Sequence, residues 1–314
     1  MSEKLNILVT GGAGYLGSTL VPRLLSLGHR VTVIDNFMFN QTSLNAVCGD
    51  PNFNVVNGDV RLIDDIKPLI SKSDVIIPLA ALVGAPLCNK DPVAAKTTNY
   101  DAVKLMLELI SDEQRILMPT TNSAYGSGDE NNFCTEESPL NPISSYAIEK
   151  VKVEKDLMQH ENAISFRLAT VFGMSPRMRV DLLVNDFVYR ACKDRAVILF
   201  EGHFKRNYIH VKDVAQAFEH GLKNFDTMKS QIFNVGLSSA NLSKIELCEA
   251  IQKQIPEFTF IEAGAGKDPD QRNYIVSNEK LERLGWKPKV SLVDGISELI
   301  KGYRMLRNNL HGNV

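Results

Sequence analysis

Short, continuously apolar segments alternate with longer amphipathic segments over the first half of the chain. Continuous apolarity is typical of parallel strands covered on both faces, and apolar residues at helical spacing are typical of the helices that cover them. The alternation therefore predicts an α/β fold with a doubly wound parallel sheet. The predicted strands are Leu5–Val9, Val31–Ile34, Asn54–Val56, Val75–Leu79, Ile116–Met118 and Ile164–Leu168, and the predicted helices include Gly14–Leu27, Val93–Ile110 and Ser144–His160.

The pattern changes after about Ala169, where the regular alternation ends. Proline and arginine gather in Met174–Arg179, and helical and short strand-like segments are mixed from there on. We therefore expect residues 1–170 to form the main domain. Residues 171–314 are expected to form mainly a smaller, mixed α/β substrate-binding lobe, from which some segments return to the first domain.

Composition narrows the classes of function. The chain is 44% hydrophobic and 23% charged with a formal net charge of −2, which argues against a nucleic-acid-binding protein with a basic face. Its five cysteines are scattered without a CxxC pair, so we expect reduced thiols in a cytoplasmic protein and no metal site. Glycines interrupt the apolar stretch Leu5–Leu27 where a signal peptide would have its apolar helix, and no apolar run approaches the roughly 20 residues of a membrane helix.

A glycine-rich segment, Val9–Gly17, follows the first predicted strand and opens the first predicted helix. Gly11, Gly14 and Gly17 permit a tight turn, close approach of a pyrophosphate and close packing of the helix on the strand. The helix N-terminus then offers free N–H groups to phosphate. A glycine triplet alone would also fit an ordinary strand–helix turn, so the interpretation depends on the next strand.

That strand ends at Asp35, about 20 residues after the last glycine, where a carboxylate would bind the ribose hydroxyls of a dinucleotide. A carboxylate there repels a 2′-phosphate and no arginine follows it, so NAD is favoured over NADP. Together these features predict a Rossmann-type domain that binds NAD, with Tyr15, Leu16 and Asn36 beside the glycines and the carboxylate. Gly58–Val60, after the third strand, would either hold the adenine amine or form a turn.

Four of the eight tyrosines are followed by a lysine four positions later, a spacing that places both side chains on one face of a helix. The pairs are Tyr100–Lys104, Tyr146–Lys150, Tyr189–Lys193 and Tyr208–Lys212. Position distinguishes them, because ligands gather at the carboxyl ends of parallel strands and Tyr146 follows a strand whose end carries Thr121. We therefore interpret Thr121, Tyr146 and Lys150 as catalytic.

These residue types suit the removal of hydride from a secondary alcohol, which requires loss of the hydroxyl proton at the same time. A free tyrosine, with a pKa of about 10, is protonated at neutral pH, and a nearby ammonium stabilises its phenolate. Thr121 would hold the alcohol against Tyr146, and Lys150 would lower the pKa of the tyrosine.

The chain resembles, over nearly its whole length, the extended short-chain dehydrogenases/reductases that act on nucleotide sugars. The resemblance rests on Thr10–Gly17, the Thr121 region, Tyr146–Lys150, Arg206–Val211 and Leu284–Pro288. It implies an NAD-dependent enzyme with a nucleotide-sugar substrate. With the apolar residues of the helices Val93–Ile110 and Ser144–His160, it also implies a homodimer with a four-helix interface.

The resemblance assigns further residues to the two ligands. For the cofactor it implies Gly11, Gly14, Gly17, Asp35, Asp59, Val60, Leu79, Ala80, Ala81 and Asn99. For the substrate it implies Asn122, Ser123, Thr170, Asn185, Arg206 and the basic positions Lys267 and Arg272. Among these, Asn185 and Arg206 would bind the diphosphate, and either Lys267 or Arg272 would occupy a C-terminal phosphate-binding position.

Departures from the family pattern bear on the reaction. Asn122 and Ser123 stand where 4,6-dehydratases carry an acid pair, so dehydration is disfavoured, and Thr170 stands where asparagine is usual. Segments 78–88, 120–126 and 177–187 resemble GDP-D-glycero-D-manno-heptose 4-dehydrogenases of bacterial capsule synthesis, which implies oxidation of C4 to a ketone. A UDP-glucose-type 4-epimerase, which begins with the same oxidation, and a non-catalytic NAD-binding protein are the alternatives.

Overall fold

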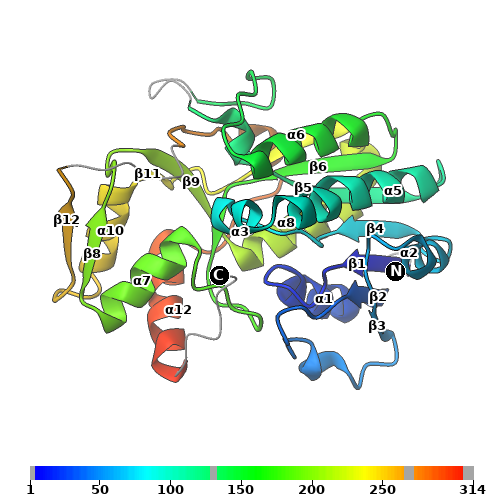
Figure 1. The fold of residues 1–314 in the computed structure, drawn as a ribbon, viewed down its shortest axis with the longest axis horizontal. Helices are drawn as coiled ribbons and strands as arrows, with labels where there is room; N and C mark the ends of the chain where they lie inside the picture. The colour runs from blue at the N-terminus through cyan, green and yellow to red at the C-terminus, as the bar shows by residue number, and fades with distance from the viewer. Residues whose placement is uncertain (1–3, 128–132, 265–271, 307–314) are drawn as a thin grey trace.

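The computed structural model describes residues 4–127, 133–264 and 272–306 of the chain. Its centre is a seven-stranded sheet in the order β10-β6-β5-β4-β1-β2-β3, with every neighbouring pair parallel (Figure 1). The order reverses between β1 and β4, as in the Rossmann-type sheet expected from the sequence, which is confirmed. The strands are β1 (Asn6–Thr10), β2 (Arg30–Asp35), β3 (Phe53–Asn57), β4 (Val75–Pro78), β5 (Arg115–Thr121), β6 (Ala163–Leu168) and β10 (Gln231–Val235).

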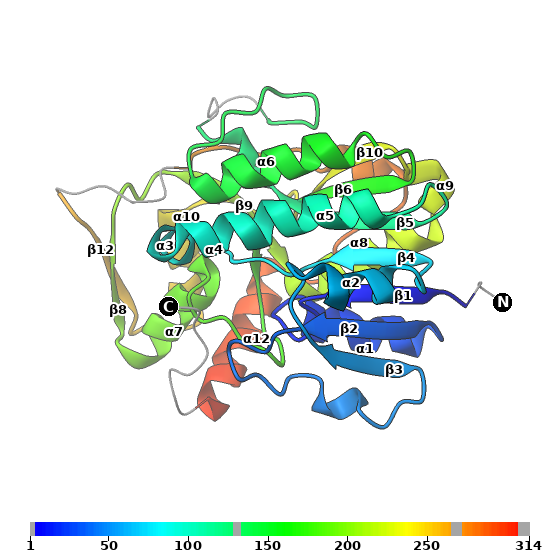
Figure 2. The same cartoon turned by 45° about the vertical axis from the view of Figure 1, so that its right-hand side comes forward.

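Helices cover both faces of this sheet, which explains the continuous apolarity of its strands (Figure 2). On one face, α1 and α8 bury Leu20 and Phe218 in the same apolar core as strand residue Phe166. On the other face, α2, α5 and α6 bury residues such as Met106 and Leu157. These helices are α1 (Gly17–Ser26), α2 (Ile63–Ile70), α5 (Ala102–Leu109), α6 (Ser145–Leu157) and α8 (Val211–Lys223).

The helix predicted over residues 93–110 is interrupted in the structure. It consists of α4 (Pro92–Lys96), the π-helical turn η2 (Thr97–Asp101) and α5, after the short helix α3 (Ala85–Lys90). The helix predicted over residues 144–160 is α6, and the side chain of Ser144 caps it by accepting a hydrogen bond from the backbone of Ala147 at 3.3 Å. The homodimer across these two helical segments stays a prediction.

A smaller lobe lies beside the sheet (Figure 1). It contains α7 (Leu183–Lys193), α10 (Lys244–Gln252), α12 (Leu292–Met305), a three-stranded sheet β11-β9-β7 and a two-stranded sheet β12-β8. The second half of the chain also supplies β10 and α8 to the main sheet and its cover. The remaining elements are β7 (Thr170–Phe172), β8 (Ala196–Leu199), β9 (Lys205–His210), β11 (Asn241–Ser243), β12 (Thr259–Glu262), α9 (Phe225–Met228), α11 (Glu279–Arg283), η1 (Asn45–Val47) and η3 (Asn122–Tyr125).

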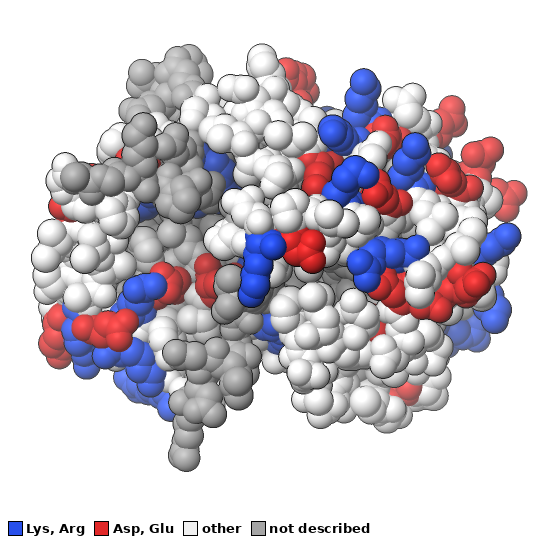
Figure 3. All heavy atoms as spheres, in the orientation of Figure 1, with Lys and Arg blue, Asp and Glu red and all other residues white. Residues whose placement is uncertain are grey.

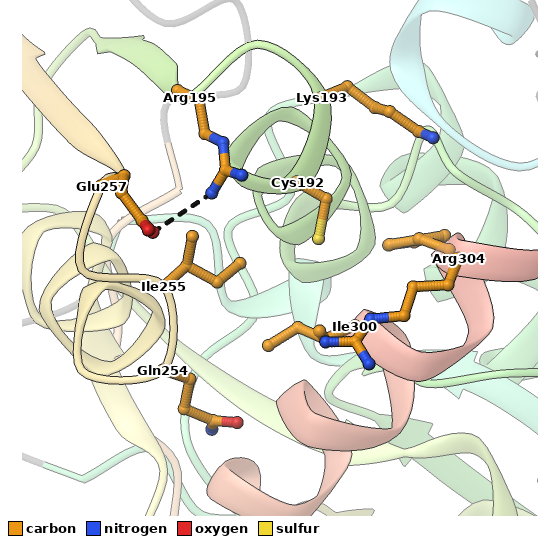
Figure 4. Close-up of a pocket in the computed structure, with 9 residues that line it drawn as sticks. Cys192, Lys193, Arg195, Gln254, Ile255, Glu257, Ile300 and Arg304 are labelled. Atoms are coloured by element: carbon orange, nitrogen blue, oxygen red, sulfur yellow. Dashed lines mark hydrogen bonds and ion pairs between the residues drawn. The ribbon is translucent and has the colours of Figure 1, made fainter.

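A cavity of about 400 Å³ lies within the lobe, near the ends of α7, α10 and α12 (Figure 4). Lys193 and Arg304 lie in the last turns of α7 and α12, where the helix dipole favours cations. Arg195 pairs with Glu257 at 3.3 Å, and both side chains are largely exposed. The positive charge around this cavity is therefore explained by the helix ends themselves.

Acidic and basic side chains are interspersed over the described part of the face drawn in Figure 3. Within residues 4–127, 133–264 and 272–306, no helix combines the length and apolarity needed to cross a membrane.

A buried ion pair joins α6 to the strands on which it packs. Arg167 on β6 and Glu154 on α6 approach to 2.6 Å, with side chains only 4% and 6% exposed. Glu154 also accepts hydrogen bonds from Thr120 at 2.9 Å and Ser165 at 2.8 Å, so its carboxylate ties together the ends of β5 and β6. Arg167 donates further to the hydroxyl of Tyr125 at 3.0 Å. Such a pair is stable only when every polar group is matched, as here.

We predict that Arg167→Met lowers the free energy of unfolding by about 3–5 kcal/mol, because it leaves the Glu154 carboxylate buried without a cation. Urea denaturation would measure this. Lys96→Met, which breaks an exposed pair with Asp101, is the control and should change stability by less than about 1 kcal/mol. Equal effects of the two substitutions would contradict the prediction.

Candidate active site

A cavity of about 840 Å³ opens at the carboxyl ends of the parallel strands. Its walls include Gly11 after β1, Asp35 at the end of β2, Leu79 after β4 and Thr121 at the end of β5. The lobe supplies the opposite side, with Arg206 on β9 among the lining residues. The switch in strand order between β1 and β4 places this opening where ligands bind in doubly wound sheets.

Most residues predicted from the sequence line this one cavity. They are Gly11, Gly14, Tyr15, Leu16, Gly17, Asp35, Asn36, Asp59, Val60, Leu79, Ala80, Ala81, Thr121, Ser123, Tyr146, Lys150, Thr170, Arg206 and Arg272. Of the four Tyr–x–x–x–Lys pairs, only Tyr146–Lys150 lies in its lining. The structure therefore brings the two ligand sites inferred from sequence into a single space.

The glycine loop is shaped by its own packing and by the cavity. A Cβ atom on Gly11, whose φ is +64°, would lie 2.6 Å from the backbone of Ala80, and one on Gly17 would lie 2.4 Å from the carbonyl oxygen of Gly12. A Cβ atom on Gly14 would meet only the carbonyl oxygen of Gly11, at 3.0 Å. Since Gly14 lines the cavity, a side chain there would occupy space that a pyrophosphate needs.

Asp35 is held in the cavity wall at the end of β2. Its carboxylate accepts hydrogen bonds from the backbone of Ala13 at 3.0 Å and of Phe37 at 2.9 Å, and from Gln41 at 3.1 Å. Burial raises its pKa, and these hydrogen bonds oppose that shift. Asp59 is engaged differently, because the hydrogen bond from Arg61 at 2.5 Å holds its pKa below the ordinary value.

The three candidate catalytic residues come from the end of β5 and the first turns of α6. Thr121 donates to the hydroxyl of Ser123 at 3.0 Å and accepts from its backbone N–H at 3.1 Å. Arg272 donates to the same hydroxyl, which extends the chain of polar contacts toward the lobe. The ammonium of Lys150 donates to the carbonyl of Pro119 at 3.4 Å, so it stays beside the end of β5.

Burial dominates the electrostatics of the Tyr146–Lys150 pair in the protein alone. It raises the pKa of Tyr146 to about 12, against the opposing influence of Arg179 and Arg272. It lowers the pKa of Lys150 to about 8, which leaves the ammonium as the main form at pH 7. The lysine is thus charged, but the tyrosine needs further positive charge in the cavity to act as a base near neutral pH.

Three predicted residues lie outside the cavity lining. Asn99 is buried in η2, where its amide exchanges hydrogen bonds with the backbone of Leu82 at 2.8 and 3.0 Å. Asn122 is fully buried in η3 and is absent from the cavity lining. Asn185 is also fully buried, and its roles are to accept from Gly173 and to donate to the carbonyl of Arg179. Lys267 lies outside the described residues.

Sequence reasoning missed a group of charged residues that line the cavity from the lobe: Arg177, Arg179, Asp181 and Asp186. Arg177 lies near Asp35, and its guanidinium is 4.8 Å from the ring centre of Phe39. The signal was visible as charges in an otherwise apolar stretch before a helix, but the stretch was interpreted as the start of the lobe and as part of a family resemblance, with no role assigned to its charges. Among the described residues, no group of three or more His, Cys, Asp or Glu side chains could hold a metal ion.

The chain is similar to known proteins over nearly its whole length. A model of the NAD dependent epimerase/dehydratase family matches residues 7–236. The low-salt glycan biosynthesis protein Agl12 of Haloferax volcanii is 28% identical, over 95% of this chain and 98% of that protein. UDP-glucuronic acid decarboxylase 1 of Arabidopsis thaliana is 28% identical, over 96% of this chain and 70% of that protein.

A solved structure shows the same fold over almost the whole chain. It is a UDP-glucuronic acid 4-epimerase from Bacillus cereus in complex with UDP-glucuronic acid and NAD. The TM-score is 0.86 at 22% identity, with 96% of this chain and 100% of that chain covered.

We predict that Gly14→Ala weakens NAD binding by at least about tenfold, or about 1.4 kcal/mol, because the added methyl group enters the pyrophosphate space. Titration calorimetry with NAD would measure it, and the melting temperature would show whether the fold is intact. Gly49→Ala, at a position with open space around the Cβ atom, is the control. Unchanged NAD affinity in Gly14→Ala would show that the pyrophosphate lies elsewhere.

Proposed function

The chain belongs to the NAD dependent epimerase/dehydratase family, and from that membership we propose that it oxidises the C4 hydroxyl of a nucleotide sugar to a 4-keto sugar. The observation that carries the proposal is the presence of Thr121, Tyr146 and Lys150 in the same cavity as the glycine loop and Asp35. The substrate that we favour is GDP-D-glycero-D-manno-heptose, on the sequence resemblance of segments 78–88, 120–126 and 177–187.

Thr121, Tyr146 and Lys150 have different roles in removing the hydroxyl proton. Thr121 holds the C4 hydroxyl, and Tyr146 takes its proton as C4 becomes a carbonyl carbon. The ammonium of Lys150 favours the phenolate form that accepts this proton. Bound NAD would supply a hydride acceptor, and its oxidised ring would add positive charge to the cavity. That added charge acts in the direction needed to offset the raised pKa of Tyr146.

The positively charged residues of the cavity suit the nucleotide diphosphate. Arg206 is 3% exposed and lies on β9, and Arg272 reaches the cavity beside Ser123. A guanidinium offers two parallel N–H groups, which match phosphate oxygens better than an ammonium does. We assign both arginines to the diphosphate, at the end of the cavity that Thr170 also lines.

Dehydration is less favoured than oxidation alone. Elimination of water needs a carboxylic acid or carboxylate near C5 and C6 of the sugar. Asn122 is buried away from the cavity, and the hydroxyl of Ser123 is engaged with Thr121 and Arg272. Glu136, an acid further along the chain, accepts from the backbone of Asn234 at 2.7 Å and is absent from the lining, and Asp181, which does line the cavity, is paired with Arg179.

We predict that Tyr146→Phe retains NAD but lowers kcat by about 10²–10⁴-fold, the usual contribution of a positioned proton transfer. Steady-state rates and NAD titration would measure the two quantities separately. Tyr100→Phe is the matched control, because Tyr100 heads another Tyr–x–x–x–Lys pair and hydrogen-bonds to Asp156 outside the cavity. A Tyr146→Phe enzyme within about tenfold of the wild-type rate would remove this residue as the base.

We expect the product to be a 4-keto sugar that has lost two hydrogens and kept its C6 oxygen. Incubation with NAD and a panel of GDP-, UDP- and dTDP-sugars, including the GDP-heptose, followed by mass spectrometry and NMR, would identify it. Unchanged mass with inverted C4 would instead establish a 4-epimerase, which uses the same oxidation. Loss of water would show that an acid outside this set supports elimination.

A further inference from the structure

Arg179 and Asp181 form a partly buried ion pair in the wall of the active-site cavity. The guanidinium of Arg179 donates to the carboxylate of Asp181 at 2.5 and 3.3 Å and to the carbonyl of Val83 at 3.3 Å. The two side chains are 10% and 22% exposed, and both residues line the cavity. The buried amide of Asn185 donates to the backbone carbonyl of Arg179 at 2.8 Å. The pair is therefore fixed before a ligand arrives.

This fixed pair retains unused hydrogen-bonding groups. A guanidinium has five N–H donors, and Nε and Nη2 of Arg179 make the contacts just described. Within the described residues, Nη1 has no acceptor. The carboxylate of Asp181 likewise has lone pairs beyond those that the guanidinium uses. A donor and an acceptor thus stand side by side in one wall of the cavity.

The pair lies near the reacting end of the cavity. Arg179 contacts Val83, in the loop that follows β4, and a Cβ atom on the neighbouring Gly84 would lie 3.9 Å from its Nη2. Tyr146 packs against the apolar cluster that contains Leu82, a residue of the same loop. The influence of Arg179 on the pKa of Tyr146 agrees with this proximity. A group bound to the pair would accordingly be part of the sugar that presents its C4 hydroxyl to Tyr146.

The charge of the pair decides what it recognises. Because Asp181 already balances Arg179, a second carboxylate would gain little from the cation and would be repelled by the acid. A hydroxyl group can both accept from Arg179 and donate to Asp181, and neighbouring sugar hydroxyls can do so together. We propose that Arg179 and Asp181 select a neutral, polyhydroxylated glycosyl group, so that the substrate is a neutral nucleotide sugar and not a nucleotide-linked uronic acid.

This inference rests on the proposed function and narrows its substrate class. It separates the chain from the relatives whose names specify UDP-glucuronic acid. In those substrates C6 is a carboxylate. Oxidation of C4 would make the sugar a β-keto acid, which can lose that carboxylate. A neutral sugar has no such carboxylate to lose, and its 4-keto product is stable to decarboxylation.

The test compares matched ligands that differ only in C6. Calorimetry on the NAD-bound protein would measure binding of UDP-glucose against UDP-glucuronate and of GDP-mannose against GDP-mannuronate, and turnover would be followed in parallel. We expect each neutral ligand to bind at least about tenfold more tightly than its acid. Equal or tighter binding of the acids would overturn the inference while leaving C4 oxidation intact. A neutral preference without turnover of any sugar would support it and reject the proposed function.

Two substitutions test whether Arg179 and Asp181 cause the preference for neutral sugars. Asp181→Asn leaves the charge of Arg179 unbalanced, so it should move the preference toward the acid by at least about tenfold. Arg179→Gln should weaken the neutral ligand by about 10–100-fold, as expected for loss of a hydrogen bond to a charged group. If Arg179→Gln does not fold, Asp181→Asn and the wild-type comparison decide the matter.

The control is Glu279→Gln, which breaks the exposed pair of Glu279 with Arg283 on α11 and should leave the preference unchanged. An unchanged preference in Asp181→Asn would overturn the assignment to this pair. So would a change in Glu279→Gln as large as that in Asp181→Asn, because it would show that the effect is not local.

Discussion

The active-site geometry depends on the buried contact between Glu154 and Arg167. Thr121 belongs to β5, whereas Tyr146 and Lys150 belong to α6, so proton transfer requires a fixed distance between a strand and a helix. Glu154 supplies that constraint, because its carboxylate joins α6 to Thr120 on β5 and to Arg167 on β6. A well-matched pair of this kind contributes little net stability but defines one arrangement of the elements around it.

The sheet adds a second constraint, because it fixes where along the strands the residues of the active site lie. All seven strands are parallel, so their carboxyl ends face the same side and the residues after β1, β4 and β5 converge there. The lobe closes the opposite wall. Cofactor-binding and catalytic residues therefore occur mainly in the first half of the chain, and residues that meet the distal parts of a substrate occur in the second.

The residues that could be predicted from sequence were those with local signals. The first six strands of the sheet, the glycine loop and Asp35 follow from apolar patterning and short spacing, and the position of Tyr146 follows from the strand before it. The π-helical turn at Thr97–Asp101 could not be predicted, because the apolar periodicity continues through it. Asn185 was assigned by resemblance to the diphosphate, whereas in the structure it holds the backbone of the segment before α7. Arg179 and Asp181 stood out only as charges in an apolar stretch, and their place in the cavity wall, where Arg179 contacts the distant Val83, could not be predicted from the local sequence.

Asn185 fixes both ends of the segment from Gly173 to Arg179, and this has a consequence for how such an enzyme can change over time. The segment carries Arg179 into the cavity, yet it shares no residue with β5 or α6. On the assignment of Arg179 and Asp181 proposed above, replacing side chains along this segment would alter which sugar is accepted while the backbone of β5 and α6 stays as it is. Selection could thus change substrate range through a segment separate from the elements that carry Thr121, Tyr146 and Lys150.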